Sequence, residues 1–167
     1  FKPIDNETDF ENYLKDKQSN HIIIIDRLSS FSIHPSRLFN YLKEFDFFLA
    51  LPGEVMPLCH NIVEAMSVGT IPILQKGYAD AMRPPLKDGE TCFTFVDLED
   101  IQKKIELLFS LPLDEIIRIR KQVLQQYSEY FSPHAIVKEL ESRKHKRVFL
   151  MAEYHSVSLL ENSLKNK

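Results

Sequence analysis

Apolar residues occur in two patterns that succeed one another along this chain. Short continuous runs, rich in β-branched and aromatic residues, predict strands at 22–25, 46–51, 70–74 and 92–95. The first run is four consecutive isoleucines, and the absence of alternation is typical of a parallel sheet covered on both faces. Between the runs, apolar residues recur at helical spacing. This order predicts an α/β fold with a doubly wound, Rossmann-like parallel sheet.

The helical stretches carry recognisable start and stop signals. Thr8 and Glu11 have the spacing of a capping box, Pro35 opens a second helix, and Gly69 is expected to end another in a left-handed conformation. The helices are expected at 8–16, from 35 onward, 59–68, 97–109 and 113–131. We expect 75–90 to be an irregular loop, because Gly, Pro and charged residues are frequent there.

The chain is expected to have two parts. Residues 1–133 form the Rossmann-like domain. Residues 134–167 form a helical extension that packs either on that domain or on a missing N-terminal domain, and the two alternatives are equally compatible with its apolar pattern.

Composition narrows the classes of partner and compartment. The 167 residues fit one domain, and a net charge of −3 without a long basic run argues against nucleic acid as the main partner. No apolar stretch is long enough for a transmembrane helix, and no signal peptide is visible. We interpret Cys59 and Cys92 as free thiols, which predicts a cytoplasmic protein, either free or peripherally attached to a membrane.

The segment CHNIVEAMSVGTIPIL, at 59–74, is the most informative part of the sequence. It places one carboxylate, Glu64, among apolar neighbours and directly before the predicted Gly69 turn and strand. An ionised group in such surroundings needs a compensating partner. Glu64 is therefore expected to meet an internal donor, to reach solvent at the helix edge, or to accept hydrogen bonds from a ligand.

This segment resembles the donor-binding signature of GT-B glycosyltransferases, which have two facing Rossmann-like domains. The resemblance covers about 21–132 and includes DFFLALPGE at 46–54, EAMSVGTIPIL at 64–74 and PPLKDGETCFTF at 84–95. It implies the C-terminal half of such an enzyme, with Glu64 receiving the ribose hydroxyls of a UDP- or GDP-linked sugar and the Gly69 turn approaching the donor. Retaining members often carry a second glutamate eight residues earlier. Met56 stands there in this chain, so the stereochemical class stays open.

Further binding residues are proposed on the same grounds. His60 and Asn61 open the helix, where they could face a diphosphate or merely cap the helix end. Three cations of the 75–90 segment could neutralise the diphosphate without a metal, or be ordinary solvated charges, and one tyrosine could stack on the donor or pack: Lys76, Arg83, Lys87 and Tyr78. The histidines lack metal-ligand spacing, so no metal site is expected.

Three functions compete at this point. The resemblance favours the donor-binding domain of a transferase that acts on a glycan or lipid-linked glycan, with its catalytic base and second wall supplied by a missing N-terminal domain or a partner subunit. A non-catalytic α/β interaction module is the alternative. Another Rossmann-like nucleotide enzyme is disfavoured, because the chain has four glycines and no Gly-x-Gly-x-x-Gly or Walker-type loop.

Overall fold

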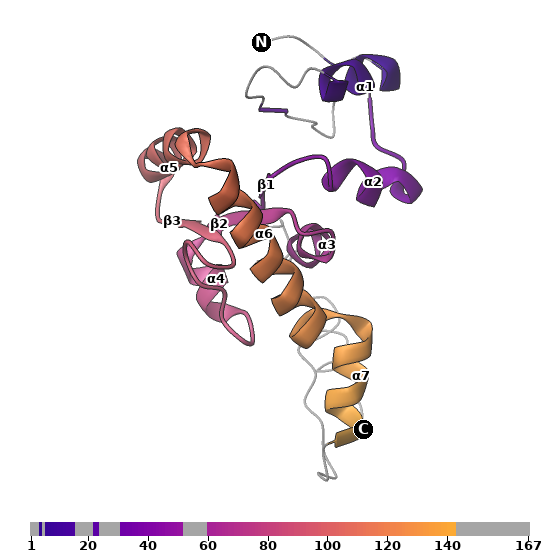
Figure 1. The fold of residues 1–167 in the computed structure, drawn as a ribbon, viewed down its shortest axis with the longest axis vertical. Coiled ribbons are helices and arrows are strands. Elements are labelled where there is room, and N and C mark those ends of the chain that lie inside the picture. Colours follow the sequence, from indigo (N-terminus) through magenta and orange to yellow (C-terminus); the bar gives the residue numbers. More distant parts are fainter. Residues whose placement is uncertain (1–3, 5, 16–21, 24–30, 52–59, 143–167) are drawn as a thin grey trace, which may run out of the picture.

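The centre of the fold is a small parallel sheet. In the computed structural model, which describes residues 4, 6–15, 22–23, 31–51 and 60–142, the strands are β1 (Phe47–Leu49), β2 (Ile71–Gln75) and β3 (Phe93–Phe95) (Figure 1). They pair in the order β1-β2-β3, with Phe47 opposite Ile71 and Ile73 opposite Phe93. The described residues therefore form a mixed α/β fold around a three-stranded parallel sheet.

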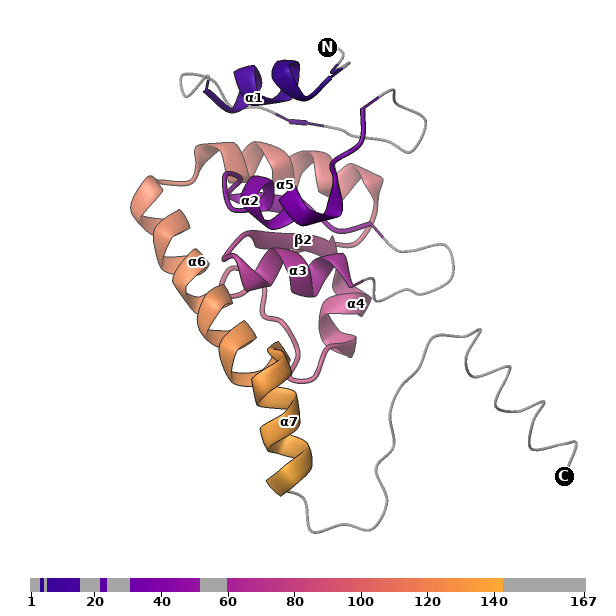
Figure 2. The ribbon, with the colours of Figure 1, turned by 90° about the vertical axis from the view of Figure 1, so that its right-hand side faces the viewer.

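Helices cover both faces of this sheet. Figures 1 and 2 agree in placing α3 and α4 on one side and α2 and α5 on the other, while α6 runs past one end of β2. The helices are α1 (Glu7–Lys15), a 3-10 turn η1 (Pro35–Arg37), α2 (Leu38–Leu42), α3 (Asn61–Ser67), α4 (Lys76–Ala81), α5 (Leu98–Ser110), α6 (Leu113–Gln126), the π-helix η2 (Tyr127–Phe131) and α7 (Pro133–Ser142).

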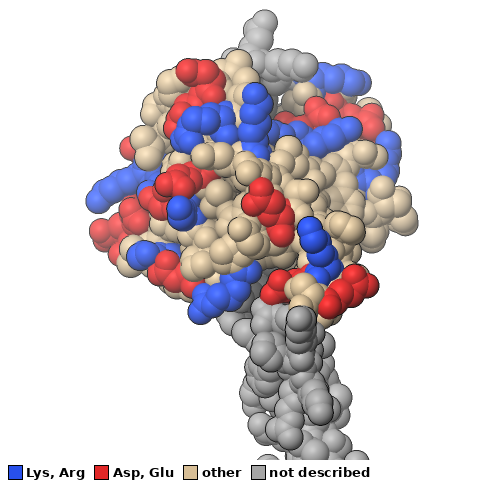
Figure 3. All heavy atoms as spheres, turned by 60° about the horizontal axis from the view of Figure 1, so that its bottom comes forward, with Lys and Arg blue, Asp and Glu red and all other residues tan. Residues whose placement is uncertain are grey.

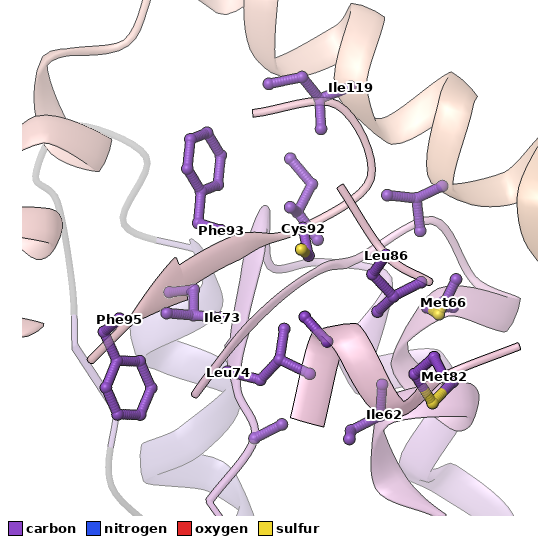
Figure 4. Close-up of a cluster of buried hydrophobic side chains, with 14 of the residues drawn as sticks. Ile62, Met66, Ile73, Leu74, Met82, Leu86, Cys92, Phe93, Phe95 and Ile119 are labelled. Atoms are coloured by element: carbon purple, nitrogen blue, oxygen red, sulfur yellow. The ribbon is translucent and has the colours of Figure 1, made fainter. Parts of the chain in front are cut away.

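The main core is built around β2. Ile71, Leu74 and the neighbouring Cys92 have no exposed surface, as expected for a strand covered on both faces. Side chains from the sheet and from the surrounding helices converge on it in Figure 4: Ile62, Met66, Met82, Leu86, Phe93, Phe95 and Ile119. Burial of this apolar set supplies the main driving force for folding.

Helix α6 lies across the amino ends of all three strands. Before β1, the Arg120 guanidinium donates to the Asp46 carboxylate at 2.9 Å and to the carbonyls of Phe45 and Lys43 at 2.8 and 3.0 Å. Before β2, Gly69 packs against Leu124. Before β3, Arg118 donates to the Gly89 carbonyl at 3.2 Å. The amino edge of the sheet is therefore covered by one helix.

A second, smaller core holds α1. Phe10 is 1% exposed and packs edge-on against Tyr41, with 4.8 Å between ring centroids, and also against Phe31. The Tyr41 hydroxyl donates to Glu7 at 2.6 Å, which lowers the pKa of Glu7 and raises the pKa of Tyr41 to about 12. Arg37 also pairs with Glu7. This aromatic cluster lies apart from the core around β2.

Most of the expected elements are present with shorter limits. The strands predicted at 46–51, 70–74 and 92–95 correspond to β1, β2 and β3, and the helices predicted at 59–68, 97–109 and 113–131 to α3, α5 and α6 with η2. Asp97 caps α5 by accepting from the Asp100 amide at 2.9 Å. Gly69 has φ +77°, as expected for a left-handed helix end.

Three local predictions are wrong. Helix α1 begins at Glu7 and is capped by Asn6, whose side chain accepts from the Asp9 amide at 3.0 Å, so Thr8 is not the cap. Ile22 and Ile23 belong to no strand and Ile22 is 62% exposed; the other two isoleucines of that run lie outside the described residues. The segment 75–90 is not wholly irregular, because β2 extends to Gln75 and α4 follows directly.

The C-terminal extension is described in part. Helix α7 carries an apolar stripe, and its residues Ile136, Val137 and Leu140 are all exposed. Residues 143–167, which include the rest of the predicted extension, lie outside the described residues. Its packing therefore stays a prediction.

We predict that Gly69→Ala destabilises the protein by more than the cost of a left-handed alanine alone, which is roughly 1–2 kcal/mol. An added Cβ would lie 2.9 Å from Leu124 Cγ. Gly89→Ala is the matched control, since Gly89 has φ +73° but nothing within 4 Å of the added atom. Urea denaturation should give Gly69→Ala a lower free energy of unfolding than Gly89→Ala. Adding Leu124→Ala to each variant should reduce the difference between the two. Equal losses would contradict the close-approach argument.

We also predict that Arg120→Gln costs about 2–3 kcal/mol of unfolding free energy, because it removes charge-assisted hydrogen bonds to the residues before β1. Arg120 is 22% exposed, so water replaces those bonds incompletely. Arg118→Gln is the control: its side chain is 44% exposed and pairs chiefly with Glu115 of the same helix. Its loss should stay below about 1 kcal/mol. A smaller loss for Arg120→Gln than for Arg118→Gln would contradict this role.

Candidate functional site

The carboxyl edge of the sheet is where three helices begin. α3 leads back from this edge to β2, α4 starts directly after Gln75, and α5 starts three residues after β3. Figure 2 shows α4 at one end of β2 and α6 at the other. In parallel α/β sheets ligands bind outside the carboxyl ends of the strands. Because α6 covers the amino edge, the carboxyl edge is the candidate functional site.

Glu64 lies on the first turn of α3. The helix buries Ile62, Ala65 and Met66, whereas the Glu64 side chain is 29% exposed. Of the outcomes expected for this carboxylate, solvent contact is therefore the one observed, and Glu64 is not an enclosed charge. Its Oε2 atom lies 3.9 Å from Nε2 of His60, whose side chain is 76% exposed. The carboxylate consequently keeps accessible acceptor capacity.

Asn61 differs from its neighbours on α3. The residue as a whole is partly exposed, yet its Oδ1 atom is buried and has no hydrogen-bond donor within the described part of the chain. His60 is the N-cap residue, but its side chain makes no capping hydrogen bond. Helix capping, the alternative to phosphate binding for His60 and Asn61, is therefore seen for neither side chain. A buried acceptor without a donor costs about 1–3 kcal/mol. Asn61 therefore holds an unfavourable arrangement at the candidate site.

Helix α4 places two more candidates. Lys76 is its first residue and pairs with Asp80, with Nζ 3.1 Å from Oδ2; both side chains are more than half exposed. Lys76 and Asp80 are four residues apart, which is the spacing of an ion pair on a helix. The pair was not predicted from the sequence, because 75–90 was expected to be an irregular loop. Tyr78 is partly buried and packs against the core, which matches the packing alternative for it.

Arg83 and Lys87 are not gathered at the carboxyl edge. The Arg83 guanidinium donates to the carbonyls of Asp80 and Met82, both at 2.8 Å, at the end of α4 away from β2. Lys87 lies in the turn that precedes β3 and pairs with Glu90 at 3.4 Å. This turn adjoins α6 at the amino edge, since Gly89 accepts from Arg118. The three cations of the 75–90 segment therefore do not lie at one edge of the sheet.

The Gly69 turn also faces the amino edge. Its close contact is with Leu124 of α6, so it does not provide the backbone approach to a donor that the resemblance implied. Of the predicted site residues, four lie at the helix starts on the carboxyl edge: His60, Asn61 and Glu64 at α3, and Lys76 at α4.

The described residues offer no metal cluster and no activated thiol. No group of three or more His, Cys, Asp or Glu side chains in these ranges is arranged to hold a metal ion. Cys92 has no exposed surface, and burial, followed by the nearby Asp88 carboxylate, raises the pKa of its thiol to about 12. A protonated, enclosed thiol is a core residue rather than a nucleophile.

Known proteins give no direct guide to this site. Comparisons with protein-family models, with curated protein sequences and with solved structures each found no match. Within the described ranges, no helix has the length and apolar character needed to cross a membrane. On the face drawn in Figure 3, basic and acidic side chains are interspersed rather than gathered by sign.

We predict that Cys92 reacts slowly with a thiol reagent in the folded protein, measured in a Cys59→Ser background so that one thiol is followed. The raised pKa keeps the folded thiol protonated at pH 8, whereas an unfolded thiol ionises near its usual value of about 8.5. The free energy of unfolding therefore does not depend on this thiol below a pH of about 8.5. It falls as the pH rises above that value, because only the unfolded thiol ionises there. Addition of urea should release full reactivity. Rapid labelling without denaturant would contradict the buried assignment.

Proposed function

We propose that the chain is the nucleotide-sugar-binding domain of a glycosyltransferase and forms the C-terminal half of a GT-B architecture. The donor lies at the carboxyl edge of a doubly wound sheet, and Glu64 accepts hydrogen bonds from its ribose hydroxyls. The observation that carries this proposal is the partly exposed Glu64 carboxylate at the carboxyl edge, on a helix whose other side is fully packed. The sequence resemblance around 64–74 supplies the chemical class of the ligand.

A carboxylate at this place suits a vicinal diol. It has two oxygens and accepts without donating, so both hydroxyls of a ribose can donate to it. Such charge-assisted hydrogen bonds are roughly twice as strong as neutral ones. The buried neighbours Ala65 and Met66 hold the backbone of the helix in place, so the ordering cost on binding is confined to the Glu64 side chain.

Lys76 is the cation available to the donor diphosphate. Its pairing with Asp80 is an exposed i,i+4 ion pair, and such pairs contribute about 0–1 kcal/mol. Exchange of Asp80 for a phosphate therefore costs little. We propose that the remaining charge is neutralised by groups of the second wall of the site, without a metal ion.

The second wall comes from an N-terminal domain or a partner subunit, which also supplies the acceptor site for a glycan or lipid-linked glycan. In an inverting enzyme it supplies the catalytic base as well. Holding donor and acceptor together in a closed cleft can supply roughly 7–11 kcal/mol of the barrier, and one sheet edge provides a single wall of such a cleft. The isolated chain is therefore expected to bind the nucleotide without transferring sugar at a rate typical of the complete enzyme.

We predict that Glu64→Gln weakens nucleotide binding by about 1.5–3 kcal/mol, because it keeps the shape of the side chain and removes the charged acceptor. Calorimetric titration with UDP, GDP and CMP first identifies the base, and the variant is then titrated with the nucleotide that binds best. Glu106→Gln is the matched control, since Glu106 is an exposed residue of α5. Its affinity should equal that of the unchanged protein.

Two results would contradict this assignment in different ways. Unchanged affinity in Glu64→Gln, with an intact fold, would remove Glu64 from the site. No binding of any nucleotide by the folded protein would favour the non-catalytic interaction module over the transferase.

A further inference from the structure

Helix α6 has an exposed apolar side in addition to the side that packs on the sheet. Leu113, Ile117 and Leu124 are all exposed, Leu113 to 68%. With Arg120 among them, these residues follow one another at intervals of four, three and four, which is the spacing of the contact line between paired helices. The side that faces the core is formed by other residues: Ile116, Ile119 and Val123. We call the exposed set, Leu113, Ile117, Arg120 and Leu124, the α6 stripe.

The α6 stripe lies on the outside of the described fold. Figure 2 shows α6 as the outer margin of that fold at this end of the sheet. Arg120 does not bring a free charge into the stripe, because its guanidinium is bonded to Asp46 and to two backbone carbonyls before β1. Apolar side chains exposed in a row, unlike those scattered singly over a surface, mark an interaction site.

Two charges of opposite sign border the stripe. Asp114 directly follows Leu113 and Lys121 directly follows Arg120, so the two charges are about two helical turns apart on the same side of the stripe. Both side chains are exposed, and neither makes an ion pair or a side-chain hydrogen bond within the described part of the chain. The neighbouring charges Glu115 and Arg118, in contrast, pair with each other.

This charge pattern is complementary to itself. When two copies of a helix pair antiparallel about a two-fold axis, a position near the start of one faces a position near the end of the other, and the reverse holds as well. Asp114 of each copy then faces Lys121 of the other, so both charges are paired. A partner of uniformly acidic or basic character would complement only one of them.

We propose that the α6 stripe is a self-association surface, on which a second copy of this chain binds with its own α6 antiparallel. Leu113 of one copy packs near Leu124 of the other, and the two Ile117 side chains lie close to the two-fold axis. The contact line spans one fourteen-residue helix, so the interface is small and belongs with weak, transient ones, which bury less than about 1,200 Å².

The second copy leaves the candidate functional site free. Because α6 covers the amino edge of the sheet, a chain bound there does not reach the carboxyl edge and is not the second wall of the proposed donor site. Self-association is therefore independent of nucleotide binding, and either proposal can fail without the other.

Analytical ultracentrifugation over micromolar to millimolar protein concentrations tests the association. The unchanged protein should shift from monomer towards dimer as its concentration rises. Ile117→Gln should weaken dimerisation about tenfold, because each dimer contains the substitution twice. Ile136→Gln on α7 is the matched control, since Ile136 is 48% exposed and Ile117 is 43% exposed; it should leave the dissociation constant unchanged. A monomer throughout, or equal effects of the two variants, would overturn the proposal.

A charge exchange tests the antiparallel arrangement. Asp114→Lys and Lys121→Asp each place like charges opposite one another in a dimer of identical chains, so each variant alone should be more monomeric than the unchanged protein. In an equimolar mixture of the two variants, one chain carries lysine and the other aspartate at both positions. The mixture should therefore dimerise at least as well as the unchanged protein. Failure of the mixture to recover, with both variants folded by circular dichroism, would overturn the proposed pairing.

Discussion

The packing of α6 across the amino ends of the strands is the constraint on which the rest of this structure depends. The three strands enter the sheet at Asp46, Gly69 and Gly89, and α6 contacts each of these places. Because the strands are parallel, a helix at their amino ends leaves all three carboxyl ends at the opposite edge for other groups. The candidate site therefore lies at the edge of the sheet opposite to the one that α6 covers.

This arrangement separates the residues that hold the fold from those proposed to bind the nucleotide. Arg120, Leu124 and Gly69 act where no ligand is proposed, and Glu64 and Asn61 lie on α3 at the other edge. Helix α3 connects the proposed binding residues to the core. It begins at the carboxyl edge, and its residues Ala65 and Met66 are buried in the interior. The polar side chains at its start can therefore serve a ligand while its apolar side chains hold it in the core.

The parts of the fold that were predictable share a strong local cause. Gly69 and strand β2 combine a helix-ending residue with continuous β-branched residues, and the structure has both. The failures have competing causes. Asn6 and Thr8 both suit a cap, and the choice of Asn6 depends on where Phe10 enters its aromatic cluster. Ile22 has the composition of a buried strand, but burial is decided by neighbours rather than by composition.

The candidate site was predictable as a place and less so as a set of residues. The helix around Glu64 was readable from local sequence, and its position at the carboxyl edge follows from parallel strand order. The positions of Lys76 and Lys87 at opposite edges of the sheet could not be predicted from the sequence. They depend on the formation of helix α4 within a segment that contains Gly and Pro. The lack of a hydrogen-bond partner for Oδ1 of Asn61 results from packing and could not be predicted from the sequence.

The separate aromatic core around Phe10 has a consequence for how the molecule loses its structure. Because α1 is held by Phe31, Tyr41 and Arg37 rather than by the sheet, its contacts can break while the core around β2 stays closed. A local opening of α1 is therefore expected to expose its amides to solvent at a lower free energy than the opening that exposes the amides of β2. A probe placed in α1 would then report an earlier loss of structure than a probe placed in β2.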